Sequence, residues 1–231
     1  MASYRNILCT SALLASCLVS SFASAGGMAL GATRIIYPAG QKQVSLSVHN
    51  KSDSTSFLVQ SWTEGSDGKK SNDFVVTPPL YVSGPGNENT MRIMYAGQPV
   101  KKDRETLYYF DSKSVPSLDK KAMEGKNILL LAAITRIKLF VRPAGLSPSV
   151  EDAPSTLTFH KQGNTLRIDN PTPYYITLAK MTYAGQKMPD TMVPPLDSTS
   201  LPVSSSASGT VSFHTINDYG ALTSVRDVAV S

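Results

Sequence analysis

Apolar and polar residues alternate in short runs along most of the chain. Residues 44–50 alternate strictly, which is typical of a strand with one buried face. Similar runs recur about every ten residues, separated by clusters of Gly, Pro, Asn, Asp and Ser. This pattern predicts an all-β chain with no helix of note. The strands expected in the first half are residues 32–37, 44–50, 57–63, 74–82, 90–95, 106–110 and 127–143, with a polar loop at 112–126.

The last of these runs, residues 127–143, breaks the alternation. Residues 128–134 are all apolar, and Arg136, Lys138 and Arg142 then alternate with apolar residues. A helix fits the first half, but the β-branched and aromatic content and the closing Arg-Pro favour a strand. Such a strand would span roughly 50 Å, several times the usual length. It belongs inside a sandwich, or it is an apolar edge that a partner covers.

Proline and glycine positions indicate how the strands are grouped. Pro78-Pro79 interrupts the run at 74–82, so this segment is expected at a sheet edge or where a strand changes sheets. The Pro/Ser/Gly-rich residues 144–154 predict a boundary between two immunoglobulin-like β-sandwich domains, 26–146 and 147–231. The second domain has weaker periodicity; its expected strands are 157–160, 165–169, 174–179, 209–214 and 225–230, with a loop at 189–206.

The first 25 residues have the features of a cleavable signal peptide. Arg5 precedes an apolar core at 7–19, and Ala-Ser-Ala at 23–25 supplies a cleavage site. The core is too short for a membrane span. An alternative is lipid attachment at Cys17, because Leu-Ala-Ser-Cys resembles a lipoprotein box. Export is predicted in both cases, and conventional cleavage removes both cysteines, Cys9 and Cys17.

Composition and motifs argue against enzymatic and nucleic-acid-binding functions. The net charge of +5 becomes +4 without the leader, and the charges are scattered rather than clustered. The three histidines, His49, His160 and His214, lie far apart and fit no metal-ligand or nucleophile spacing. No phosphate-binding glycine loop is present. We therefore expect no catalytic residues, no metal, no cofactor and no small-molecule substrate.

Seven ordered segments resemble the signature segments of PapD-like periplasmic pilus chaperones of the chaperone–usher pathway. The resemblance covers essentially the whole mature chain, and it implies two immunoglobulin-like domains arranged in an L with a cleft between them. The segments are TRIIY at 33–37, TPP at 77–79, NTMRI at 89–93, DRE at 103–105, IKLFVRP at 137–143, NPTPYY at 170–175 and NDYG at 217–220.

The resemblance also implies residue roles. Arg34 and Lys138 would bind the C-terminal carboxylate of a pilin subunit in the cleft. Alternate side chains of the donor strand, Leu129, Leu131 and Ala133, would fill a groove in the subunit. Because the run is apolar on both faces, the opposite parity stays open. Ala133 is smaller than the residue usual at its position, which implies a shallower contact.

A third set of residues, Glu105, Arg142 and Asp218, corresponds to an interdomain ionic cluster that would hold the angle between the domains. The loop before the donor strand contains no cysteine, which is similar to the branch that serves rod-forming pili. The implied partners are pilin subunits and an outer-membrane usher, in the periplasm and without ATP. Self-association that caps the apolar edge is a further possibility for the free protein.

A function from another class is a secreted two-domain adhesin or carbohydrate-binding module. Such a protein needs an open polar and aromatic site. The candidates are the pairs Tyr108-Tyr109 and Tyr174-Tyr175.

Overall fold

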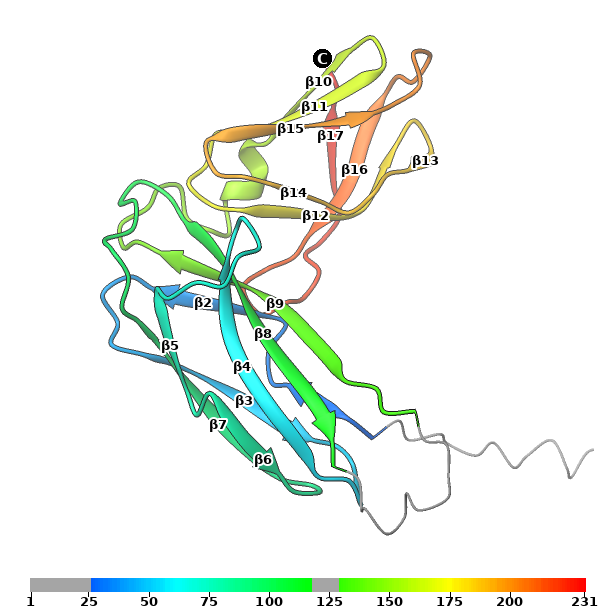
Figure 1. Ribbon diagram of the computed structural model, residues 1–231. Helices are drawn as coiled ribbons and strands as arrows, with labels where there is room; N and C mark the ends of the chain where they lie inside the picture. The colour runs from blue at the N-terminus through cyan, green and yellow to red at the C-terminus, as the bar shows by residue number, and fades with distance from the viewer. Residues whose placement is uncertain (1–25, 118–128) are drawn as a thin grey trace, which may run out of the picture.

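The computed structural model describes residues 26–117 and 129–231, which form two β-sandwiches with the outline of an L (Figure 1). The expected leader lies outside the described residues. The first sandwich pairs the sheet β1-β3-β7-β5 with the sheet β2-β9-β8-β4-β6. Its strands are β1 (Met28–Leu30), β2 (Arg34–Pro38), β3 (Val44–Asn50), β4 (Phe57–Gly65), β5 (Phe74–Thr77), β6 (Leu80–Ser83), β7 (Glu88–Tyr95), β8 (Thr106–Pro116) and β9 (Ala133–Arg142).

The second sandwich pairs the sheet β10-β11-β15 with the sheet β13-β12-β16-β17, where β14 also pairs with β12. One 3-10 helix, Ala153–Thr156, precedes it. No helix in the described ranges is long and apolar enough to cross a membrane. The strands are β10 (Thr158–Gln162), β11 (Thr165–Asn170), β12 (Ile176–Tyr183), β13 (Gln186–Lys187), β14 (Thr191–Val193), β15 (Asp197–Pro202), β16 (Thr210–Thr215) and β17 (Arg226–Ala229).

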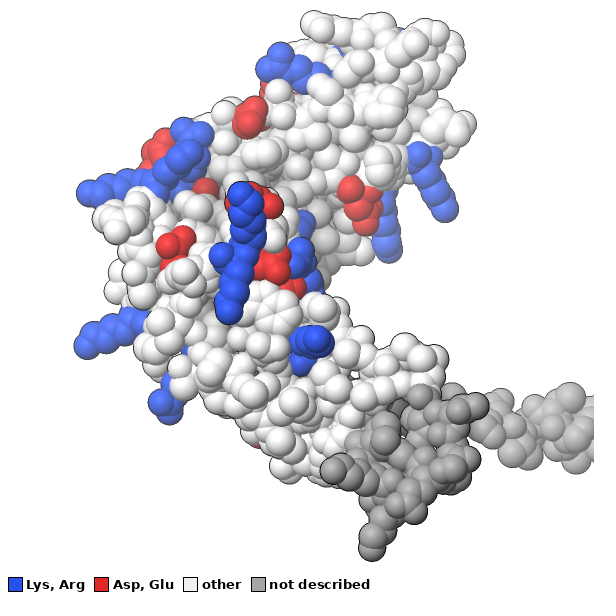
Figure 2. Space-filling view, viewed as in Figure 1, with Lys and Arg blue, Asp and Glu red and all other residues white. Residues whose placement is uncertain are grey.

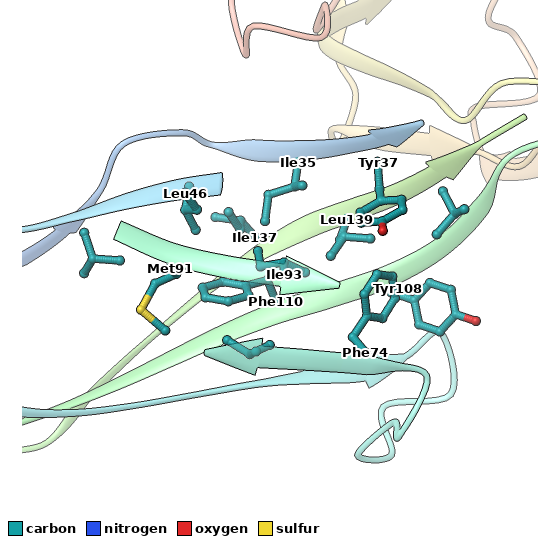
Figure 3. Close-up of a cluster of buried hydrophobic side chains, with 13 residues drawn as sticks. Ile35, Tyr37, Leu46, Phe74, Met91, Ile93, Tyr108, Phe110, Ile137 and Leu139 are labelled. Carbon is teal, nitrogen blue, oxygen red and sulfur yellow. The ribbon is translucent and has the colours of Figure 1, made fainter. Parts of the chain in front are cut away.

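Each sandwich has its own hydrophobic core, which confirms the predicted fold class. The alternating residues of β3, β4 and β7 turn one face inward, and the inward side chains meet those of the opposite sheet. In the first core, Met91, Ile93, Phe110 and Leu139 are fully buried between the sheets (Figure 3). A separate cluster around Phe159, Leu178 and Phe213 fills the second sandwich.

The prolines at 78 and 79 lie where the chain changes sheets. β5 ends at Thr77 at the edge of one sheet, and β6 begins at Leu80 at the edge of the other. Proline has no backbone N–H to donate to a ladder, so this position between two edge strands leaves no donor missing. Both parts of the prediction for this segment are confirmed.

The predicted loop at 112–126 is wrong at its start, because β8 continues to Pro116. The polar residues Asp111, Ser112 and Ser114 are buried, yet they have partners within the sheet. Ser61 Oγ donates to Ser112 Oγ over 3.4 Å, and Arg136 contacts Asp111. Polar residues with satisfied hydrogen bonds can therefore continue a strand that hydrophobicity alone would end. Residues 118–126 lie outside the described part of the chain.

The predicted loop at 189–206 is also wrong, because it contains β14 and β15. β15 pairs with β11 from Asp197 to Pro202, and its side chains are mostly half-exposed or exposed. A strand at a sheet edge with Ser and Thr facing water lacks the apolar alternation on which the sequence prediction relied. The short strands β1 and β13 carry too few residues for a periodic signal.

Each sandwich contains a turn of the same kind, and in each a buried asparagine side chain holds the turn. Asn50 Nδ2 donates to the carbonyl oxygens of Thr55 and Gly84 at 2.8 Å each, and Asn50 Oδ1 accepts the Ser52 N–H at 3.0 Å. Asn170, the last residue of β11, repeats this pattern and donates to the carbonyl oxygens of Tyr174 and Pro194, also at 2.8 Å. One side chain thus satisfies several backbone groups that no ladder reaches.

We expect Asn50→Ala to lower the free energy of unfolding of the first domain by about 2–4 kcal/mol, because buried carbonyl groups lose their donor. Trp62 on β4 is the only tryptophan of the chain, so its fluorescence during urea unfolding reports on this domain. The exposed Asn72 is the matched control, and Asn72→Ala should change stability by less than about 0.5 kcal/mol. Equal effects of the two variants would contradict the assignment.

Candidate functional site

Half of strand β9 is an open sheet edge. β8 pairs with β9 from Val141 to Ala133, which is nearly the whole strand. On the other side, β2 pairs with β9 in parallel, but only from Lys138 to Arg142. Residues 133–137 therefore present backbone groups that no described strand covers. An edge of this kind can pair with a strand from another chain.

The apolar run before β9 is exposed to solvent. Leu129 is 81% exposed, Leu131 69% and Ile134 57%, and Ala133 is exposed as well. The predicted strand at 127–143 is wrong in length, since β9 begins only at Ala133. The ladder to β8 ends at the pair Ser114–Ala133, so the preceding residues have no strand partner. Residues 127 and 128 lie outside the described ranges.

Solvent exposure does not decide which of the two alternating sets of side chains in this run would face a partner. Leu129 and Leu131, on the expected parity, are more exposed than Leu130, which is 47% exposed. All three leucines nevertheless remain accessible to a partner. The donor-strand assignment of Leu129, Leu131 and Ala133 therefore stays a prediction.

Arg34 and Lys138 lie side by side at the point where the open edge ends. They are register partners on β2 and β9. Arg34 Nη1 donates to the Ile216 carbonyl oxygen at 3.0 Å, and Lys138 Nζ donates to Thr177 Oγ1 at 3.3 Å. Both acceptors belong to the second sandwich. The buried Arg34 Nε has no hydrogen-bond acceptor among the described residues.

The contact partners of the cations on β9 and of Arg34 on the adjacent strand β2 divide these four residues into two kinds. Arg136 contacts two carboxylates, Asp111 at 2.8 Å and Glu64 at 2.5 Å. Arg142 also contacts two carboxylates. Within the described part of the chain, Arg34 and Lys138 contact only neutral oxygen atoms. These two cations therefore make no direct contact with a carboxylate of the described chain, and an anion can bind them.

Burial affects the basicity of both cations. Desolvation lowers the pKa of Arg34, although the negative charges of Asp218 and Glu105 act in the opposite direction. Desolvation also lowers the pKa of Lys138, and the neighbouring positive charge of Arg34 lowers it further. A bound carboxylate would relieve this unfavourable pairing of like charges. The geometry and the electrostatics thus both favour an anion at this position.

Glu105, Arg142 and Asp218 form one ionic cluster across the two sandwiches. Arg142 Nε lies 2.7 Å from Glu105 Oε1, and its two terminal nitrogens contact Asp218 Oδ2 and Oδ1 at 2.5 and 2.7 Å. Glu105 is only 2% exposed, and its second oxygen accepts the Tyr175 N–H at 2.8 Å. Arg142 and Glu105 belong to the first sandwich, whereas Asp218 and Tyr175 belong to the second.

The cluster keeps Glu105 buried despite its charge. Burial raises the pKa of the Glu105 carboxyl, while the charge of Arg142 and the Tyr175 N–H act to lower it. Burial acts to lower the pKa of Arg142, but its hydrogen bonds and charge attraction to Asp218 and Glu105 outweigh this effect and raise it. Glu105 and Arg142 therefore depend on each other for their charged states.

A cavity of about 300 Å³ lies between the sandwiches beside this cluster. Arg34, Phe140 and Arg142 line it from the first sandwich, and Ile216 and Tyr219 are among the residues that line it from the second. Figure 2 shows basic and acidic side chains close together in the hollow between the two bodies. Lys138 does not line the cavity. A ligand that contacts both Arg34 and Lys138 would therefore extend out of the cavity toward the open half of β9.

Sequence reasoning missed several residues of this site. The Arg136–Asp111–Glu64 contacts depend on the β8–β9 register, in which Asp111 lies opposite Arg136. Thr177 and the Ile216 carbonyl group come from the other domain. Only the alternation of basic residues along 136–142 indicated that this strand carries a charged face.

The tyrosine pairs proposed for an adhesin do not form an open aromatic site. Tyr108 and Tyr174 are 8% and 5% exposed, and their hydroxyl groups donate to Asp73 and to the Pro148 carbonyl oxygen. No group of His, Cys, Asp or Glu in residues 26–117 and 129–231 is arranged to hold a metal ion.

Comparison with known proteins identifies the class of this chain. Residues 27–147 match the family model described as the N-terminal domain of the pili and flagellar-assembly chaperone PapD, and residues 152–226 match that of the PapD C-terminal domain. The chain belongs to the PapD family of pilus-assembly chaperones. This result confirms the resemblance noted in the sequence.

Individual relatives match most of this chain and most of their own length. The probable fimbrial chaperone SfmC of Escherichia coli K12 is 46% identical over 205 residues, 89% of either chain. The solved periplasmic chaperone SfaE has a TM-score of 0.75 at 42% identity, covering 88% of this chain and 100% of its own. The chaperone SafB, solved in complex with the Salmonella enterica pilin SafA, has a TM-score of 0.80 at 31% identity, covering 88% and 96%.

We expect Lys138 to titrate below the ordinary lysine value of 10.5, because its ammonium group is partly desolvated beside Arg34. Carbon-13 NMR of the lysine side chains can follow this titration. Arg34→Gln should raise the pKa of Lys138, though not to 10.5, since burial is the larger cause. A pKa at or above 10.5 in the unaltered protein would contradict this account.

Removal of Arg142 should destabilise the first domain strongly. Arg142→Met leaves the Glu105 carboxylate buried without its cation, and we expect a loss of about 3–5 kcal/mol in the free energy of unfolding. Urea unfolding followed by Trp62 fluorescence measures it. The double variant Arg142→Met, Glu105→Gln should recover part of the loss. Arg92→Met, at an exposed arginine on β7, is the control and should have little effect.

Proposed function

We propose that this protein is a non-enzymatic periplasmic chaperone that binds pilin subunits by donating the strand around Leu129–Ala133. The observation that carries the proposal is the open edge of β9, with exposed apolar side chains at one end and the cations Arg34 and Lys138 at the other. Membership of the PapD family and the pilin complex of the relative SafB support it.

The position of the cations determines the direction of the bound strand. A subunit strand along residues 129–137 that ends with its carboxylate at Arg34 and Lys138 runs parallel to β9. β2 is also parallel to β9 and begins at Arg34. The subunit strand would therefore continue the line of β2 and fill the sheet position that β2 leaves open. Its main chain would form the hydrogen bonds that the edge lacks.

The energetic roles of the two parts differ. Burial of the side chains of Leu129 and Leu131 in a subunit groove would contribute about 1.5–3 kcal/mol each. The carboxylate contacts would add charge-assisted hydrogen bonds and would fix the register of the pairing, because the cations occupy one position along the strand. Arg34 offers a planar bidentate donor, and Lys138 offers a point charge.

The ionic cluster has a supporting role in this proposal. Arg142, Glu105 and Asp218 would keep the two domains at the angle at which Thr177 and Ile216 reach the cations. The loaded chaperone would deliver its subunit to an outer-membrane usher. Without a subunit, pairing of two β9 edges in a self-associated form would protect the apolar run from solvent.

Native mass spectrometry of periplasmic extracts tests the proposal. The extracts come from cells that express this protein together with a pilin subunit encoded beside it. The unaltered protein should form a one-to-one complex. Leu131→Asp and Lys138→Glu should each weaken it at least about tenfold, through lost apolar burial and through charge reversal. Val75→Asp and Lys187→Glu change an exposed apolar residue and an exposed lysine outside the site, and they should leave the complex intact.

Each possible failure has a separate meaning. A complex that survives Leu131→Asp would exclude strand donation by this run. A complex that survives Lys138→Glu but not Leu131→Asp would retain strand donation and exclude the carboxylate anchor. A soluble pilin that forms no complex with the unaltered protein would overturn the chaperone function itself.

A further inference from the structure

The second domain holds both cations of the anchor through one connected set of hydrogen bonds. Lys138 Nζ donates to Thr177 Oγ1 at 3.3 Å, and Arg34 Nη1 donates to the Ile216 carbonyl oxygen at 3.0 Å. Thr177 and Ile216 are themselves joined, since the Ile216 N–H donates to the Thr177 carbonyl oxygen at 3.2 Å. Two neighbouring cations of the first domain thus donate hydrogen bonds to two residues of the second domain, and these two residues are hydrogen-bonded to each other.

Thr177 is a fixed part of the second sandwich. It is 7% exposed and lies in β12, where it is the register partner of Met192 in β14. Its neighbour Leu178 pairs with Thr215 in β16. Because both sides of this part of β12 are in a sheet, the position of the Thr177 hydroxyl group is set by the backbone rather than by a mobile loop.

We propose that Thr177 is a positioning residue for the carboxylate anchor, so that the second domain takes part in recognition of the pilin C-terminus. The inference rests on the proposed function, because it assigns a role within the site where Arg34 and Lys138 bind the carboxylate. Thr177 acts through Lys138 by holding Nζ beside Arg34.

The chemistry of the acceptor supports this role. The lysine side chain has four rotatable bonds, and a partner that fixes its end lowers the ordering cost of binding. A hydroxyl oxygen does this without neutralising the charge. The two remaining Nζ–H groups have no acceptor among the described residues and can bind a carboxylate. Arg136, two positions away, is instead neutralised by Asp111 and Glu64.

The test measures the carboxylate preference of the mature full-length protein. Its probes are two synthetic peptides with the sequence of the C-terminal strand of the co-expressed pilin, one with a free carboxylate and one with a terminal amide. The ratio of their dissociation constants measures the contribution of the carboxylate contacts alone, because the apolar contacts of the two peptides are the same. We expect the unaltered protein to bind the free acid at least about tenfold more tightly.

Thr177→Val keeps the shape of the side chain and removes the acceptor. We expect it to reduce the acid-to-amide preference by about 3- to 10-fold, the effect of one typical intramolecular hydrogen bond, and to leave amide binding unchanged. Thr177→Ser should restore the preference. Thr182→Val, on the same strand, is the matched control and should behave like the unaltered protein.

A second readout is the pKa of Lys138 in the NMR titration described above. Thr177→Val should lower it further, because the charged ammonium group loses a hydrogen-bond partner. A preference and a Lys138 pKa that are both unchanged in Thr177→Val would overturn the role of Thr177 and leave the anchor in place. An unaltered protein with equal affinity for the two peptides would overturn the anchor, and this inference with it.

Discussion

The limited overlap between β2 and β9 is the constraint on which the site depends. β2 begins at Arg34, so the parallel pairing covers β9 only from Lys138 onward. The same boundary that leaves residues 133–137 unpaired also places the two cations next to each other. The open edge and the adjacent pair of cations, where the proposed anion site lies, are thus consequences of one register. A shift of that register by one residue would turn Lys138 into the core and Leu139 out of it.

The contacts of each cation divide four basic residues on the adjacent strands β2 and β9 into two kinds. Arg136 and Arg142 are held by two carboxylates each and act within the protein. Arg34 and Lys138 are held by a carbonyl and a hydroxyl oxygen, which orient them and leave their charge in place. Chain position alone would not distinguish these pairs, because all four side chains are basic and partly exposed or half-buried.

The sequence predicts much of the fold and part of the site. The strict alternation at 44–50 coincides with β3, and Pro78-Pro79 predicts the change of sheet. Strand β15 escaped prediction because its Ser and Thr side chains at a sheet edge carry no hydrophobic period. The apolar run at 128–134 suggested a long strand, but a strand needs a neighbour, and β8 provides none before Ala133. The hydrophobicity of a residue indicates whether its side chain can be buried. Whether the residue pairs in a strand depends on the register of segments that are distant in the sequence.

The same reasoning explains why Thr177 escaped sequence analysis. The Thr177 hydroxyl group lies near Lys138 only because the second sandwich sits against β2 and β9, where Arg142 of the first domain contacts Asp218 of the second. The first domain alone contains the apolar edge and both cations, yet it lacks the oxygen atoms that orient them. In the proposed function, the ionic cluster that joins the two domains would therefore also hold the geometry of the carboxylate site. In the proposed function, the second domain would thus contribute the orientation of the two cations rather than contact area.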